Sequence, residues 1–133
     1  MSKKTKRKTL VTTLDTVFSK YIRLKNSDAN GYCNCITCGK KAYWEKDGIH
    51  AGHFMSRKHY STRWDERNVK PQCHYCNTHK YGEQYKYSLY LGKETSEDLL
   101  ELSHRTVKFS DVDLREMILL YKNLVSSLEK PYI

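Results

Sequence analysis

The sequence predicts an α+β protein in which a small, zinc-stapled finger of short strands and one helix is flanked by α-helices. Two Cys-x-x-Cys motifs separated by thirty-four residues predict the finger: Cys35/Cys38 and Cys73/Cys76. Apolar residues at helical spacing on both sides of these motifs predict the flanking helices. The 133 residues suit one small domain. We place it at residues 10–133, with the finger core at 32–92 and C-terminal helices at 95–130.

The charge is basic and unevenly distributed. Lys and Arg number 24 against 15 Asp and Glu, a formal net charge of +9. Residues 94–133 hold eight acids and five bases, a net charge of −3, so residues 1–93 carry +9 + 3 = +12. A basic half that contains the cysteine motifs suggests a polyanionic partner, and nucleic acid is the first candidate for it. We expect residues 1–9 to form a disordered basic arm. The alternative explanation of the positive charge is that it reflects only this tail and an ordinary solvated surface.

Two kinds of segment are missing from the sequence. No run of about 18 apolar residues exists, so no transmembrane helix and no membrane partner are expected. The basic N-terminus is not followed by the apolar stretch of a signal peptide. We therefore expect a cytoplasmic protein (in the host cell, if it is phage-encoded), and in that compartment paired thiols bind metal more often than they form disulfides.

The helices and strands follow from local signals. Apolar residues from Leu10 onward predict a first helix, capped by Thr12 or Thr13. Asp47-Gly48 predicts a hairpin that joins residues 42–44 to a strand starting at Ile49. Residues 55–70 are expected to form a loop that ends at Pro71. A helix should follow from about residue 73 towards 81.

The C-terminal part is predicted to be helical. A short helix over residues 83–91 should end at Gly92. Two sequences resemble capping boxes before apolar runs, at residues 95–98 and 110–113. The second should open a long helix whose apolar stripe packs on the core or on a partner.

Four thiolates in two Cys-x-x-Cys turns complete a closed, tetrahedral structural zinc site. Disulfides are the alternative, which the expected compartment disfavours. Cys33 is left over; it would be a free thiol, or could replace Cys35 in another register.

The polar residues of the finger suggest hydrolytic chemistry. His53 could act as a general base that deprotonates water, since the pKa of His lies near neutrality. Asn77 and His50 could hold a catalytic divalent cation, Mg²⁺ or Mn²⁺. Asn68 lies where it could hydrogen-bond the strand and orient His53. Any one of these residues alone would suggest a structural role; their order inside a four-cysteine finger is more specific.

Basic side chains around these residues could hold a DNA backbone. The candidates are Arg57, Arg63, Arg67, Lys80 and His79. His59 and His74 are further candidates for metal or phosphate contacts. Trp44, Trp64 and Tyr60 could stack on unpaired bases or pack in the core.

Four stretches of the chain resemble a known family, within roughly residues 32–102: Cys35 to Gly39, Ala51 to Phe54, Arg63 to Asn68 and Gln72 to Lys80. They resemble the phage recombination endonucleases called NinG or Rap, which are related to His-Asn-His (HNH) nucleases. The resemblance implies an HNH-like treble-clef finger of the ββα-metal type, with structural zinc and a separate catalytic cation. It implies that His53 is the general base, that Asn77 and residue 50 are cation ligands, and that Arg63, Arg67 and Lys80 contact phosphate.

The chain departs from the family pattern at two positions. His50 stands where Asp is expected, which could favour a softer ion such as Mn²⁺, Ni²⁺ or Zn²⁺. Glu83 stands where Asn is expected, at the far edge of the site.

The expected function is a metal-dependent DNA endonuclease that hydrolyses phosphodiester bonds in branched recombination intermediates such as Holliday junctions and D-loops. A homodimer would suit paired cuts, and other recombination proteins could be partners. The alternative is a non-catalytic zinc-finger DNA-binding module in phage recombination or replication, since a fold does not determine a function. A structural adaptor that uses the C-terminal helical stripe is a third possibility.

Overall fold

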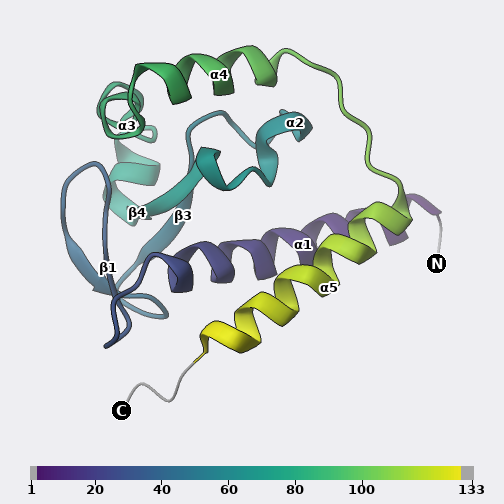
Figure 1. Ribbon diagram of the computed structural model, residues 1–133, viewed down its shortest axis with the longest axis horizontal. Helices are drawn as coiled ribbons and strands as arrows, with labels where there is room; N and C mark the ends of the chain where they lie inside the picture. Colours follow the sequence, from purple (N-terminus) through teal and green to yellow (C-terminus); the bar gives the residue numbers. More distant parts are fainter. Residues whose placement is uncertain (1–2, 130–133) are drawn as a thin grey trace.

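The computed structural model describes residues 3–129 of the chain. Its long helices α1 (Lys3–Lys25) and α5 (Asp111–Leu128) lie side by side and run in the same direction (Figure 1). An ion pair joins Arg7 to Asp111 near the start of both helices, at 3.2 Å, and another joins Lys20 to Glu129 near their ends. Their facing sides bury the main core, which Trp44 and Trp64 complete: Leu14, Phe18, Tyr21, Ile22, Leu114, Ile118, Tyr121 and Val125.

The first helix begins earlier than the sequence predicts. We expected a disordered arm over residues 1–9 and a cap at Thr12 or Thr13, but α1 is helical from Lys3; residues 1–2 lie outside the described residues. Lys and Arg are good helix formers, and the ion pair of Arg7 with Asp111 ties this segment to α5. The expectation of an irregular arm is therefore wrong for residues 3–9.

The finger contains two separate antiparallel hairpins. Strand β1 (Tyr32–Asn34) pairs with β2 (Lys41–Tyr43), and β3 (Ile49–His53) pairs with β4 (Val69–Cys73). Asp47-Gly48 does form a turn with positive φ angles of 63° and 68°. That turn leads from one sheet to the other, so the hairpin predicted across it is wrong. Turn chemistry is local, whereas the partner of a strand depends on distant segments.

Part of the predicted loop is ordered structure. Residues 55–70 contain the short helix α2 (Tyr60–Arg63), the 3₁₀ turn η1 (Glu66–Asn68) and the start of β4. Pro71 lies in the middle of β4 rather than at its boundary, paired with Ala51. Its carbonyl accepts a hydrogen bond from the Ile36 N–H at 3.0 Å on the edge away from β3. The missing N–H of the proline faces the same edge, so no β3–β4 hydrogen bond is lost.

The predictions for the second half are confirmed in most respects. A single wide turn, η2 (Tyr75–His79), follows β4, and α3 (Gln84–Leu91) ends at Gly92. Ser110 caps α5 in a reciprocal capping box with Asp113, at 2.9 and 3.0 Å. The capping box predicted at residues 95–98 is wrong, because α4 (Lys93–Ser103) already begins before it.

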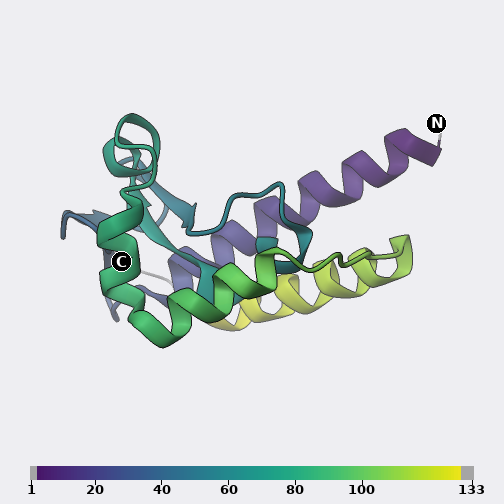
Figure 2. The same cartoon turned by 90° about the horizontal axis from the view of Figure 1, so that it is seen from above.

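The finger strands lie at one end of the α1/α5 pair, whose N-terminal halves extend beyond them (Figure 2). The C-terminal half of α1 therefore packs against the finger, where it contacts β3 and β4. Among residues 3–129, no helix combines the length and the apolar character needed to cross a membrane.

Candidate functional site

The four cysteines of the two motifs meet in one cluster. Cys35 and Cys38 lie in the turn between β1 and β2, Cys73 ends β4, and Cys76 lies in η2. Their sulfur atoms are all within 4.8 Å of one another, and the sulfurs of Cys38 and Cys73 are 3.7 Å apart. Tetrahedral zinc with Zn–S bonds of about 2.3 Å places its sulfur ligands about 3.8 Å apart. The cluster therefore fits a zinc ion.

The pKa values of the thiols differ within the cluster. Burial opposes ionisation of Cys35, but hydrogen bonds from Thr37 and from backbone N–H groups lower its pKa to about 6. Burial raises the pKa of Cys76 to about 12. Because thiolates are the ligand form, a bound divalent cation would stabilise the ionised thiols of the cluster, of which all but Cys38 are buried. Cys33 is buried in β1, outside the cluster, so the alternative register is wrong.

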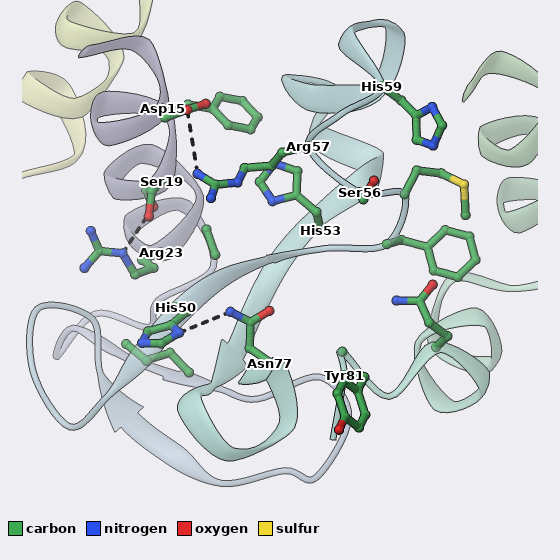
Figure 3. Close-up of a pocket in the computed structure, with 17 residues that line it drawn as sticks. Asp15, Ser19, Arg23, His50, His53, Ser56, Arg57, His59, Asn77 and Tyr81 are labelled. Atoms are coloured by element: carbon green, nitrogen blue, oxygen red, sulfur yellow. Dashed lines mark hydrogen bonds and ion pairs between the residues drawn. The ribbon is translucent and has the colours of Figure 1, made fainter. Parts of the chain in front are cut away.

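A polar cleft of about 930 Å³ lies beside the finger. Its walls come from α1, from β3 and the segment that follows it, and from η2 and the loop after η2. His50, His53 and Asn77 all line it, and the side chains of His50 and Asn77 point toward one another (Figure 3). The structure thus brings together three of the residues that the sequence singled out.

His50 and Asn77 are in direct contact. The amide nitrogen of Asn77 donates a hydrogen bond to His50 Nδ1 at 3.1 Å. Burial, together with the neighbouring His74, lowers the pKa of His50. The neutral imidazole is the form that binds metal ions. In this arrangement Nδ1 of His50 accepts the Asn77 N–H, so the pair could bind a cation there only after the Asn77 amide turns its oxygen toward it.

The tautomer of His53 follows from its partner. Its Nε2 lies 2.9 Å from the backbone carbonyl oxygen of Arg63. A carbonyl oxygen can only accept, so Nε2 carries the proton and Nδ1 keeps its lone pair. Burial lowers the pKa of His53, and the nearby Arg57 acts in the same direction. His53 is therefore neutral at pH 7, with Nδ1 able to accept a proton.

Asn68 holds the backbone around His53 and does not line the cleft. It is fully buried, and its side chain bridges two segments. Its amide oxygen accepts from the Met55 N–H at 2.7 Å, and its amide nitrogen donates to the carbonyls of Met55 and Thr62, each at 3.0 Å. These bonds join the segment after His53 to α2, which contains Arg63. Asn68 is thus placed as a positioning residue.

The basic residues predicted to bind DNA occupy different environments. Arg57 lines the cleft with an exposed side chain, 3.7 Å from Asp15. Arg63 is largely buried and makes a bidentate ion pair with Asp15, at 3.0 and 2.5 Å. Arg67 pairs with Asp65 at 3.0 Å and lies beside the acidic residues of α4. All three arginines thus have an acidic neighbour, and the DNA contacts predicted for them stay predictions.

The other candidates lie at the edges of the site. His79 stacks on Tyr75 at a ring separation of 5.7 Å, and Lys80 lies over the same ring at 5.6 Å; neither lines the cleft. His59 lines the cleft, and His74 packs edge-on against His50. Trp44 and Trp64 are buried in the core, so the base-stacking alternative is wrong for both.

Sequence reasoning missed the wall of the cleft that α1 forms. Asp15, Ser19 and Arg23 line it. They recur every fourth residue, so they share one helical face, and this polar stripe inside an otherwise apolar pattern was the signal that could have found them. Arg23 is held in place by a 2.7 Å hydrogen bond to the carbonyl of Trp44 and by stacking on the Trp44 ring.

The fold and the site define a small α+β protein with a cluster of four cysteines that fits a zinc ion, beside a histidine-lined cleft. The chain belongs to the NinG family: the family model described as Bacteriophage Lambda NinG protein matches residues 2–131. The match thus extends well beyond the residues that carried the resemblance in the sequence. Comparison with curated proteins finds no match, and comparison with solved structures finds none.

Proposed function

We propose that the protein is a metal-dependent DNA endonuclease that cleaves branched recombination intermediates, Holliday junctions and D-loops among them. One observation carries the proposal: His53, with a free Nδ1, shares a cleft with the hydrogen-bonded pair of His50 and Asn77. A module that only binds DNA has no need of a neutral base beside a pair of metal-ligand side chains. Membership of a bacteriophage protein family supports a phage recombination role.

The arrangement of strands also supports an HNH-like treble-clef assignment. The first Cys-x-x-Cys motif lies in a tight turn between two strands, and the second joins a strand to a helical turn. The β3–β4 hairpin and η2 then present His50, His53 and Asn77 from a ββα unit. The zinc cluster stabilises this unit, which has few apolar contacts of its own.

Different residues of the cleft have different roles in the proposed reaction. His53 Nδ1 accepts a proton from a water molecule, which attacks the phosphorus in line with the departing 3′ oxygen; the products carry 5′-phosphate ends. Arg57 and Arg23 place positive charge along the cleft, where they can hold the phosphate. A divalent cation held by His50 and Asn77 would supply Lewis-acid stabilisation of the charged phosphate and leaving group.

The proposal is tested by a cleavage assay on a four-way junction, a D-loop and linear duplex DNA. The zinc-loaded full chain is given Mg²⁺ or Mn²⁺, and His53→Ala is compared with His104→Ala, an exposed histidine at the end of α4. We expect metal-dependent cutting of branched DNA that His53→Ala loses and His104→Ala keeps. Tight binding without cutting under either ion would instead support the non-catalytic DNA-binding module.

Partners of the protein are part of the same proposal. Two subunits could make paired cuts across a junction, and α5 leaves Leu119 and Leu120 more than half exposed, at 61% and 52%. Sedimentation of the parent and of Leu119→Glu tests whether this helix forms a homodimer. A monomeric parent would show that each cut is made independently or with another recombination protein.

A further inference from the structure

Tyr81 has a backbone conformation that L-residues rarely adopt. Its φ angle is 52°, and it is followed by Gly82 at 85° and Glu83 at 50°. Three consecutive residues with positive φ form the loop between η2 and α3. Glycine adopts this conformation freely, but tyrosine and glutamate do so only where the surrounding structure imposes it.

Buried groups of the finger impose this conformation. The Gly82 N–H donates to the carbonyl of Cys76, and the Gly82 carbonyl accepts from the amide nitrogen of Gln72, both at 2.8 Å. Gln72 is fully buried in β4, and Cys76 belongs to the metal-binding cluster. The loop is therefore fixed to the finger through both backbone polar groups of Gly82.

This conformation leaves the ring of Tyr81 in solvent. Its side chain is 88% exposed, yet it lines the cleft beside Asn77 (Figure 3). The other Phe and Tyr residues that line the cleft, Phe18 and Phe54, are buried in the protein. Folding gains almost no apolar burial from Tyr81, so its placement is better explained by a ligand that covers the ring.

The surroundings indicate what that ligand is. The cleft also contains Arg57 and Arg23, which lie across it from Tyr81 (Figure 3). An exposed aromatic ring on one wall of a cleft and cationic side chains on the opposite walls can bind a nucleobase and the backbone phosphates of the same strand. A base inside an intact duplex is stacked on both faces and presents only its edges, so the ring requires an unpaired base.

We propose that Tyr81 stacks on an unpaired base next to the phosphate in the cleft, and thereby makes the protein prefer DNA with unpaired bases over intact duplex. The proposal rests on the proposed function for its ligand, DNA, but not for cleavage. It assigns to one fixed side chain a selectivity for branched substrates that carry unpaired bases, such as the displaced strand of a D-loop.

The experiment measures binding of the zinc-loaded full chain, without added Mg²⁺ or Mn²⁺, to a fluorescent duplex and to the same duplex with a forked end. A 2-aminopurine in the unpaired arm reports stacking. Tyr81→Asn removes the ring and suits a positive φ angle, so it does not disturb the loop. Tyr81→Phe keeps the ring, and Tyr90→Ala removes a half-exposed tyrosine of α3 that lies outside the cleft.

We expect Tyr81→Asn to weaken binding of the forked DNA at least about fivefold, with loss of the 2-aminopurine quenching and no change for the duplex. Tyr81→Phe and Tyr90→Ala should bind like the parent. Equal binding of forked DNA by Tyr81→Asn and the parent, or equal losses on both DNAs, would overturn the proposal. If the parent cuts branched DNA and Tyr81→Asn cuts and binds it equally well, only this inference fails. If the parent binds neither DNA, the proposed function fails with it.

Discussion

Asp15 of α1 accepts two hydrogen bonds from the guanidinium of Arg63, at 3.0 and 2.5 Å, across 48 residues of sequence. The backbone carbonyl of that same Arg63 accepts a hydrogen bond from His53 Nε2–H. The orientation of the proposed base therefore depends on a helix outside the finger. Asp15 also accepts a hydrogen bond from the Trp64 indole at 3.0 Å, so the ion pair is anchored to the main core.

Asp15→Asn should destabilise the fold by about 2 kcal/mol, because it leaves the largely buried charge of Arg63 without its partner. Urea unfolding of the zinc-loaded protein measures this change. Asp65→Asn is the matched control, since its partner Arg67 is half exposed, and it should cost less than about 1 kcal/mol. Equal losses for the two variants would contradict the role given to the Asp15–Arg63 pair.

Removal of the metal should unfold the finger while the α1/α5 pair keeps part of its helix. A strong chelator, or Cys38→Ser, should lower the melting temperature and abolish retention of zinc, because the cluster holds two hairpins that have little core of their own. Metal analysis and circular dichroism follow both effects. Cys33→Ser is the control: it changes a buried cysteine outside the cluster, so zinc content should be unchanged.

The cleavage rate should fall on the acidic side of neutrality as His53 becomes protonated. Burial lowers the pKa of His53 from its ordinary value of 6.5, so the folded protein keeps the neutral base, and its activity, to below that pH. Since the unfolded chain takes up this proton at a higher pH, the contribution of His53 to stability also declines as the pH falls below about 6.5. NMR titration of the His53 ring and single-turnover rates measure the two effects.

Asp15→Asn tests whether the acidic limb of the rate profile reports the pKa of His53. The Asp15 carboxylate favours the protonated imidazole, whereas Arg57 and Arg63 disfavour it. The variant should therefore move the acidic limb of the rate profile to lower pH. If the acidic limb in the parent lay at or above the ordinary histidine pKa, burial would not lower the pKa of His53 under the conditions of the cleavage assay.

His50→Asp should change the preference for the catalytic ion. An imidazole nitrogen suits softer ions, whereas a carboxylate suits Mg²⁺. We therefore expect the ratio of cleavage rates in Mg²⁺ to those in Mn²⁺ to rise in the variant. Asn77→Ala should lower the rate with both ions, because it removes the side chain that contacts His50. An unchanged ratio in His50→Asp would mean that residue 50 does not bind the ion.

Several features of the site could be predicted because their signals are local. The two Cys-x-x-Cys turns meet in one cluster as their spacing predicts, and His50, His53 and Asn77 reach the same cleft. The capping box at Ser110 forms because its two partners are three residues apart. The aromatic residue at the mouth of the cleft was not predicted, since the exposure of Tyr81 follows from hydrogen bonds that Gly82 makes with Gln72 and Cys76.

By itself, the sequence determined which side chains have the chemistry to bind metal or accept a proton, where α3 ends and where α5 begins, because side-chain chemistry and these helix caps depend on a few neighbouring residues. Only the tertiary structure decided the pairing of the strands, the placement of Pro71 inside β4 and the use of α1 as a wall of the cleft. It also decided that Arg57 and Arg63 share the carboxylate of Asp15, and that of the two only Arg57 lines the cleft. Such outcomes depend on contacts between residues far apart in the chain, and their free energies are set only when those residues meet.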